Sequence, residues 1–132
     1  MIQSGSYLRV VDNSGAVFIR CIQASKKNKC RYAYMGDMII ASVRRLRRRF
    51  KKRAKVKIGD VVSALILRTK SSLSHTSGNK TYYKSNYAII FNKQNKPIGT
   101  RIFYGMPRHI LKKFKNFATL KIVTMSTGIT ES

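Results

Sequence analysis

Residues 36–67 read GDMIIASVRRLRRRFKKRAKVKIGDVVSALIL, and this stretch decides the fold. Two segments in it are built alike, because each begins with Gly-Asp and continues into a nearly uninterrupted apolar run. A glycine next to an aspartate is typical of a turn, and short apolar runs suit strands buried on both faces, as in a small closed barrel. We therefore predict two strands, MIIASV (38–43) and VVSALIL (61–67), joined by a long basic connection.

Short β-branched runs between turn residues fill the rest of the first hundred positions. Such runs are typical of strands, and asparagine, glycine and serine clusters are typical of the turns between them. DNSG (12–15) is accordingly interpreted as a turn, and 71–81 as a polar turn or flexible loop. The further strands that we predict cover residues 7–11, 16–24, 83–91 and 97–103.

The pattern changes after Gly105, where Ile110, Leu111, Phe114 and Phe117 recur at helical spacing among lysines. This spacing predicts a short basic helix over 108–118. Residues 119–126 are apolar but too few to assign by period. The fold class is therefore mainly β, with one domain over residues 1–132. We expect a small barrel at about 1–103 and a helical appendage at about 104–126.

The charge balance points to a polyanionic partner. The chain has 28 lysines and arginines against four acids, which gives a net charge of +24. Such a charge strains a compact monomer unless a polyanion neutralises it. Nucleic acid is the default partner, and an anionic membrane is a distant second. No apolar run approaches the roughly 20 residues that a membrane-spanning helix needs.

The basic connection, residues 44–57, holds ten cations and no acid. We call it the basic arm. Three apolar residues of the arm are spaced four apart, Leu46, Phe50 and Ala54. One alternative is therefore an amphipathic helix that binds membranes or calmodulin. A second alternative is a structural segment that is merely solvated. We favour an arm that lies along phosphates, because arginine bridges them in bidentate fashion. Residues 44–55 are expected to be disordered in the free protein and to order on RNA.

The few acids argue against catalysis. Asp37 and Asp60 each follow a glycine, Asp12 lies in the DNSG turn, and Glu131 is one residue from the end. No pair of carboxylates remains for acid–base chemistry or for a divalent metal. We predict a protein that is not an enzyme and has no catalytic residue, no metal site and no cofactor.

The cysteines and histidines support the same interpretation. Cys21 and Cys30 are too few and too far apart for a zinc site, so we expect free thiols. His75 lies in a polar stretch and His109 in a basic one, and neither has a nucleophile or carboxylate arrangement beside it. Both are interpreted as surface or RNA-facing residues.

Four sequence blocks occur in order along the chain and resemble one family. They are LRVVDNSGA (8–16), RYAYMGDMIIASV (31–43), KVKIGDVVSALILRT (55–69) and PIGTRIF (97–103). The spacing from ALIL (64–67) through Ser77-Gly78, Tyr83 and Asn86 to Ile89-Ile90 fits as well. Over roughly residues 1–126 the chain resembles the universal large-subunit ribosomal protein number fourteen.

That resemblance implies a five-stranded β-barrel with small C-terminal helices, and a structural role in the large ribosomal subunit. Members bind large-subunit rRNA, lie beside other large-subunit proteins, and help form a bridge to the small subunit and its rRNA. A ribosome silencing factor docks on the same face in related ribosomes. The residues expected to contact rRNA are Arg44, Arg45, Arg47, Arg48, Arg49, Lys51, Lys52, Arg53, Lys55, Lys57, Arg31 and Asn13. The residues expected at the inter-subunit bridge are Thr100, Arg101, Arg108 and Lys121.

The chain departs from the family pattern at several places, one of which is an insertion of a few residues before Phe117. RRLRRRFKKRA (44–54) replaces a shorter, proline-containing connection, SSLSHTSGNK (71–80) replaces a basic turn, and YGMP (104–107) replaces a glycine–proline step. We also expect no signal peptide, because MIQSGSYLRVVDNSG leads directly into strand-like sequence. Together with abundant Lys, Ile, Asn, Tyr and Phe, this favours a mitochondrial ribosome, with bacterial cytoplasm or plastid stroma as alternatives.

One competing hypothesis belongs to another functional class. A free single-strand binder of the OB type presents aromatic residues on an exposed strand face for base stacking. Tyr82, Tyr83 and Tyr87 are the candidates for such stacking, although tyrosines in this pattern more often close the end of a barrel core. Co-sedimentation with large subunits at high salt separates the two hypotheses.

Overall fold

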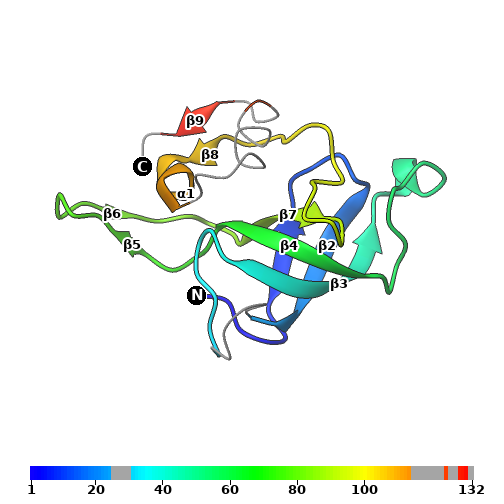
Figure 1. The fold of residues 1–132 in the computed structure, drawn as a ribbon, viewed down its shortest axis with the longest axis horizontal. Coiled ribbons are helices and arrows are strands. Elements are labelled where there is room, and N and C mark those ends of the chain that lie inside the picture. Colours follow the sequence, from blue (N-terminus) through cyan, green and yellow to red (C-terminus); the bar gives the residue numbers. More distant parts are fainter. Residues whose placement is uncertain (25–30, 114–123, 125–127, 131–132) are drawn as a thin grey trace.

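The computed structural model describes residues 1–24, 31–113, 124 and 128–130, and a closed five-stranded barrel forms its centre (Figure 1). In the order in which they pair, the strands are β1 (Tyr7–Val10), β2 (Ala16–Gln23), β3 (Met38–Leu46), β4 (Val61–Arg68) and β7 (Tyr87–Phe91). Neighbours are antiparallel except β1 and β7, which close the barrel as a parallel pair. The mainly β, five-stranded fold expected from the sequence is confirmed.

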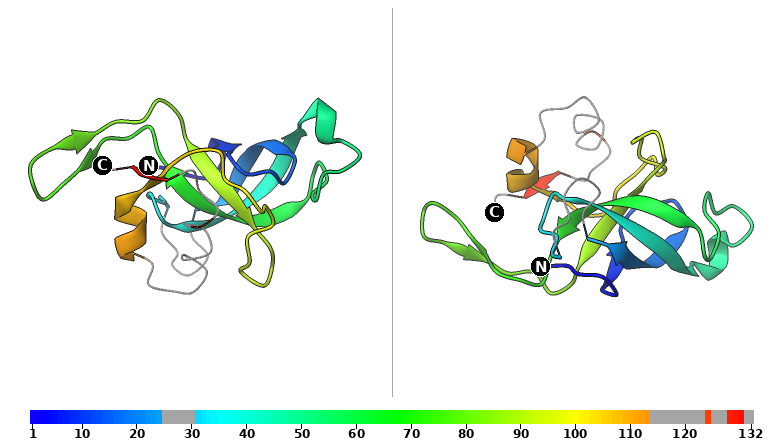
Figure 2. Two further views of the ribbon diagram at one scale, coloured as in Figure 1. Left: turned by 90° about the horizontal axis from the view of Figure 1, so that it is seen from above. Right: turned by 60° about the horizontal axis from the view of Figure 1, so that its bottom comes forward.

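Shorter elements project from the barrel or cover it. They are the 3-10 helix η1 (Arg48–Phe50), β5 (Leu73–Ser74), β6 (Lys80–Thr81), β8 (Met106–Pro107), α1 (Arg108–Lys113) and β9 (Ile129–Thr130). The β5–β6 hairpin and the basic arm extend from opposite ends of the molecule (Figures 1 and 2). Helix α1 begins where the sequence predicts a helix, and the remainder of that prediction, residues 114–118, lies outside the described residues.

The barrel interior is filled by alternate residues of the strands, as the two-residue period of a strand requires. Strand β3 contributes Ile39, Ala41 and Val43, all completely buried, and β4 contributes Ala64 and Ile66. Each fully buried aliphatic side chain of the size of isoleucine stabilises the fold by about 1.5–3 kcal/mol. This interior cluster therefore holds the barrel closed.

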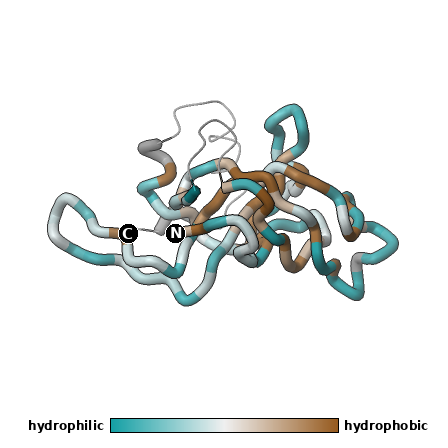
Figure 3. The backbone as a smooth tube through the Cα atoms, turned by 90° about the horizontal axis from the view of Figure 1, so that it is seen from below, coloured by the Kyte–Doolittle hydropathy of each residue, from teal (hydrophilic) through white to brown (hydrophobic). Residues whose placement is uncertain are grey.

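A second apolar layer lies outside the barrel, over β4 and β7. Leu65 and Leu67 face away from the interior and pack with Ile102, Met106 and Ile110 of the C-terminal segment. That segment lies over one side of the barrel in Figure 1. In Figure 3 the hydrophobic residues gather mainly in the barrel, while the two projections are mostly hydrophilic or of intermediate hydropathy. Burial on both faces is thus confirmed for β4. In β3, Met38, Ile40 and Ser42 are only half-buried, so the prediction of burial on both faces was wrong for this strand.

The two Gly-Asp pairs form matching turns, as predicted. The Asp37 carboxylate accepts a hydrogen bond from the Tyr34 N–H, and the Asp60 carboxylate accepts one from the Lys57 N–H, each at 2.8 Å. The glycine before each aspartate has a positive φ, 85° and 90°, which glycine adopts at no steric cost. Both turns lead directly into the strands β3 and β4.

One predicted strand is wrong. Residues 97–103 form isolated bridges at Pro97, which pairs with Phe91, and at Ile102, which pairs with Asp12, and otherwise run as a loop. Proline has no N–H to donate to a ladder. The loop instead bends around Gly99, where an added Cβ would lie 2.8 Å from the Cβ of Asp12. This close approach fixes the course of the loop across the turn at 12–15.

Candidate nucleic-acid interface

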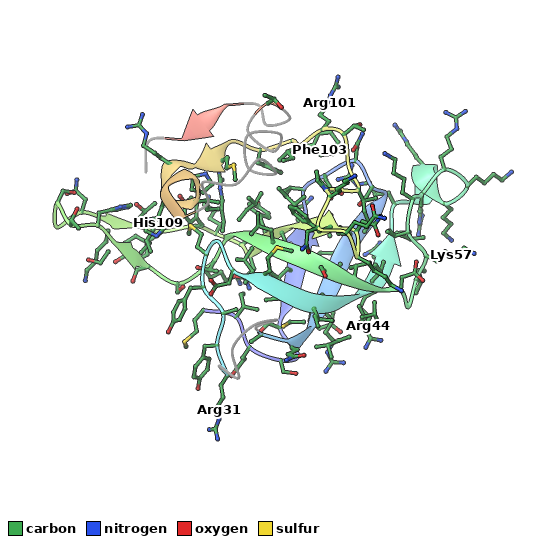
Figure 4. The ribbon with its side chains drawn as sticks, in the orientation of Figure 1. Arg31, Arg44, Lys57, Arg101, Phe103 and His109 are labelled. Atoms are coloured by element: carbon green, nitrogen blue, oxygen red, sulfur yellow. The ribbon has the colours of Figure 1, made fainter. Side chains whose placement is uncertain are left out.

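The basic arm presents its cations to solvent on a projection at one end of the barrel (Figure 4). Nine of its ten cationic side chains are exposed, and Arg47 is half-buried. The exposed ones are Arg44, Arg45, Arg48, Arg49, Lys51, Lys52, Arg53, Lys55 and Lys57. Because exposed cations of one sign attract and steer a polyanion, the arm is the strongest electrostatic feature of the described surface.

The base of the arm is part of the folded barrel. Strand β3 continues to Leu46, the Arg47 N–H donates to the Gly15 carbonyl at 2.9 Å, and Val56 is buried in the interior cluster. On the returning side the Lys55 N–H donates to the Ser14 carbonyl at 3.0 Å. The expectation of disorder over all of 44–55 was therefore too wide, because both ends of that range bond to the turn at 12–15.

A loop at residues 97–103 lies beside this turn, and we call it the GTR loop after Gly99-Thr100-Arg101. The Asn13 side chain holds it: Oδ1 accepts hydrogen bonds from the Thr100 N–H at 2.7 Å and the Arg101 N–H at 3.3 Å. Nδ2 of the same side chain donates to the Thr100 Oγ1 at 2.8 Å. The Thr100 and Arg101 side chains are exposed, and Arg101 points away from the barrel (Figure 4).

The arm also contacts the GTR loop directly. The Lys55 Nζ donates to the Ile98 carbonyl at 3.0 Å. The Arg47 guanidinium lies 5.0 Å from the centroid of the Phe103 ring, within the range of a cation–π contact. Arm, turn and loop thus form one continuous surface, although they are separated in the sequence by tens of residues.

The carboxylate of Asp12 is buried beneath that surface. It accepts hydrogen bonds from the Ser14 N–H at 2.9 Å, from the Ser14 hydroxyl, and from the Ile90 N–H at 3.0 Å. Burial raises the pKa of Asp12, while these hydrogen bonds and the positive charge of Arg47 oppose the rise. The carboxylate takes the place of a backbone carbonyl beside β7, so it helps to close the barrel beneath the loop.

A comparison with known protein families identifies the family of the chain. The family model described as ribosomal protein L14p/L23e matches residues 1–129. The chain belongs to this ribosomal protein family. It is therefore a structural protein of the large ribosomal subunit, and its place in the cell is the ribosome.

In this L14p/L23e chain the other predicted site residues lie apart from the arm. Arg31 is exposed at a different part of the surface from Arg44 and Lys57 (Figure 4), and Arg108 is exposed at the first position of α1. Lys121 lies outside the described residues. The structure thus brings Asn13, Thr100 and Arg101 together with the arm.

The remaining polar candidates in the L14p/L23e chain have local roles. The His75 Nε2 bonds with the Thr81 Oγ1 at 2.7 Å inside the β5–β6 hairpin, and His109 is exposed on α1. Cys21 is a free thiol inside the barrel, where burial raises its pKa, and Cys30 lies outside the described residues. Within the described ranges no group of three or more histidines, cysteines and acids could hold a metal, and no helix is long and apolar enough to span a bilayer.

Proposed function

We propose that the basic arm binds large-subunit rRNA through its phosphates. The observation that carries this proposal is the array of nine exposed cations on a projection whose base is hydrogen-bonded to the barrel. Arginine and lysine that neutralise phosphates release condensed counterions, so the affinity depends on the number of contacts and not on base sequence. Arg31 is a separate, exposed contact of the same kind.

We propose further that the GTR loop contributes to the bridge with the small subunit. Thr100 and Arg101 are exposed, and the Asn13 side chain fixes the backbone that carries them. Because the loop backbone is already fixed, it loses little further entropy when Arg101 meets an rRNA phosphate across the interface. Asn13, expected from the sequence to touch rRNA, serves in this proposal to position the loop. Arg108 and Lys121 remain bridge candidates of the C-terminal segment.

The proposed partners are large-subunit rRNA, neighbouring large-subunit proteins, small-subunit rRNA and a ribosome silencing factor on the bridging face. The proposed compartment is the mitochondrion, on the ground that Lys, Ile, Asn, Tyr and Phe are abundant, as in proteins encoded by AT-rich organelle genomes. Fractionation of the source cells tests the compartment: the chain should sediment with mitochondrial large subunits. Sedimentation with bacterial cytoplasmic ribosomes or with plastid ribosomes would support the alternatives instead.

The arm is tested by two variants that remove the same charge. One changes Arg48, Arg49 and Arg53 to Gln, and the matched control changes Lys80, Lys93 and Lys96, which are exposed outside the arm. Affinity for a folded rRNA fragment is measured against salt concentration. The log–log slope should fall by about 2–3 for the arm variant, at roughly 0.7–0.9 for each phosphate that is no longer neutralised, and by much less for the control. Equal slopes for both variants would refute the arm as the main contact.

The bridge is tested with Arg101→Glu, for which Lys93→Glu is the matched control. Large subunits that carry Arg101→Glu should retain the protein but associate less with small subunits, because the new charge repels phosphate. An exposed substitution leaves the barrel intact. Release of the protein from purified large subunits would instead make Arg101 an assembly contact and refute the bridge role.

A further inference from the structure

Three tyrosine rings and one arginine side chain stack against one another near the end of β4. The Arg68 guanidinium lies 4.9 Å from the ring centroid of Tyr83 and 6.0 Å from that of Tyr87. The Tyr87 ring in turn stacks on the Tyr104 ring, with centroids 5.0 Å apart and planes 15° from parallel. We call these four side chains the tyrosine column.

The inner part of the column is held in place. The Arg68 Nη2 donates a hydrogen bond to the Gly105 carbonyl at 2.7 Å, which ties β4 to the residue after Tyr104. Tyr83 and Tyr87 are half-buried against the outer apolar layer. The ring of Tyr104 is therefore presented by a supported column and is not a freely rotating surface side chain.

The outer end of the column is open. Tyr104 is 39% exposed although the Tyr87 ring stacks on one of its faces, so a large part of this residue remains accessible to solvent. An aromatic face that is already oriented is a suitable platform for a nucleobase, because stacking then orders no further protein side chain. The exposed cations Lys84 and Arg108 lie one residue after Tyr83 and four residues after Tyr104 in the sequence.

We propose that the open face of Tyr104 stacks an unpaired RNA base. This inference rests on the proposed function, rRNA binding. The phosphate contacts of the arm would then be joined by a contact that is specific for unpaired RNA. The occupant is a base that has left its helix, such as a bulged purine, because a base within a duplex offers no free face. The tyrosine column thus makes the L14p/L23e surface sensitive to RNA structure as well as to charge.

The chain contains no tryptophan, so Tyr104→Trp introduces a single fluorescent reporter at the stacking position. The probes are an RNA hairpin with one bulged adenosine and the same hairpin fully paired. We expect the bulged hairpin to quench the tryptophan emission and the paired hairpin to leave it nearly unchanged. The matched control is Tyr82→Trp, at a position that is 69% exposed, whose emission should respond equally to both hairpins.

Affinity gives a second, independent measurement. Tyr104→Phe keeps the stacking face, whereas Tyr104→Leu removes it. The Leu variant should bind the bulged hairpin about 5- to 150-fold more weakly, the range that corresponds to stacking of one base. It should bind the paired hairpin unchanged, and the Phe variant should bind both normally. Thermal unfolding of each variant identifies a loss that comes from the fold, since such a loss would weaken binding to both hairpins.

The outcomes separate this inference from the proposed function. Normal, salt-dependent binding of both hairpins without selective quenching in Tyr104→Trp, or an equal loss for both in Tyr104→Leu, overturns the stacking inference and leaves phosphate binding in place. Absence of salt-dependent binding to either hairpin overturns the proposed function, and the stacking inference with it. Selective quenching together with selective loss in the Leu variant supports both.

Discussion

The guanidinium of Arg47 lies over the ring of Phe103, 5.0 Å from its centroid, and this contact joins the basic arm to the GTR loop. The arm is the proposed rRNA contact and the loop is the proposed bridge element. Because the two are in direct contact, we expect binding at one site to affect the geometry of the other. An arm fixed on rRNA would hold Phe103, and with it Arg101, in the position seen here.

This contact predicts a measurable coupling. In a double-mutant cycle of Arg47→Ala and Phe103→Ala, the coupling free energy of unfolding should be about 0.5–1 kcal/mol, as for a cation–π pair at a partly exposed site. The control cycle pairs Arg44→Ala with Phe103→Ala, because Arg44 lies far from Phe103 in Figure 4. That pair should be additive within about 0.3–0.5 kcal/mol. Equal coupling in both cycles would show that the Arg47 contact is not specific.

The hydrogen bonds of Asn13 are predicted to stabilise the GTR loop. Asn13→Ala removes the acceptor for the Thr100 and Arg101 N–H groups and the donor to the Thr100 hydroxyl, which should lower the free energy of unfolding by about 1–3 kcal/mol. Asn13→Asp keeps an acceptor for both N–H groups and should lose less. Urea unfolding measures the stability, and subunit association measures the bridge. Equal losses for the two variants would contradict the role of Asn13 as an acceptor.

Much of the fold follows from local pattern, and the exceptions have a common cause. The Gly-Asp turns at Asp37 and Asp60 and the apolar run of β4 are visible in the sequence because turn chemistry and strand period act over a few residues. The burial of β4 on both faces was predicted from the same run. The loop at 97–103 was predicted as a strand because its side chains suit one, whereas contacts with the turn at 12–15 decide its course.

The positive charge of the candidate site could be predicted from the sequence, but the contacts between its residues could not. The arm's cations are evident in the sequence, whereas Asp12 was recognised only as a turn residue. Its bond to the Ile90 N–H joins positions 78 apart, and Asn13 and Thr100 are 87 apart. No local signal marks such pairs, because they arise only when the barrel closes. The stacking of Tyr104 on Tyr87 was missed for the same reason.

Asp12 predicts a particular dependence of stability on pH. Burial raises the pKa of its carboxyl in the folded state above the ordinary value of 3.8, so the folded chain keeps this proton to a higher pH than the unfolded chain does. The contribution of Asp12 to stability is therefore largest below pH 3.8, falls as pH rises toward the folded-state pKa, and is constant above it.

Asp12→Asn isolates this effect because asparagine does not titrate. The free energy of unfolding of the unmodified chain, minus that of Asp12→Asn, should decrease as pH rises through this window. Measurement at high salt reduces the general repulsion among the chain's cations. A difference that increases with pH would mean that the hydrogen bonds from Ser14 and Ile90 outweigh burial, and that the folded-state pKa is lowered.

Amide hydrogen exchange on the free protein should divide the basic arm into a fixed base and an open tip. The amides of Arg47 and Lys55 are bonded to the carbonyls of Gly15 and Ser14 and should exchange slowly, at rates set by opening of the barrel. Residues 49–54 carry exposed like charges, and the 3-10 helix η1 (Arg48–Phe50) covers only the first two of them, so their amides should exchange fast.

Binding of rRNA should slow exchange at the tip and leave the base as it was. Ordering the tip costs about 1–2 kcal/mol per residue, and phosphate contacts offset that cost, so ordering and binding occur together. A deletion that joins residue 48 to residue 54 through Asn-Gly keeps the bonds of Arg47 and Lys55 and should leave a folded barrel with weakened rRNA binding. Slow exchange across 49–54 without RNA would show that the tip folds alone, and fast exchange at Arg47 and Lys55 would show that the arm is not anchored to the turn at 12–15.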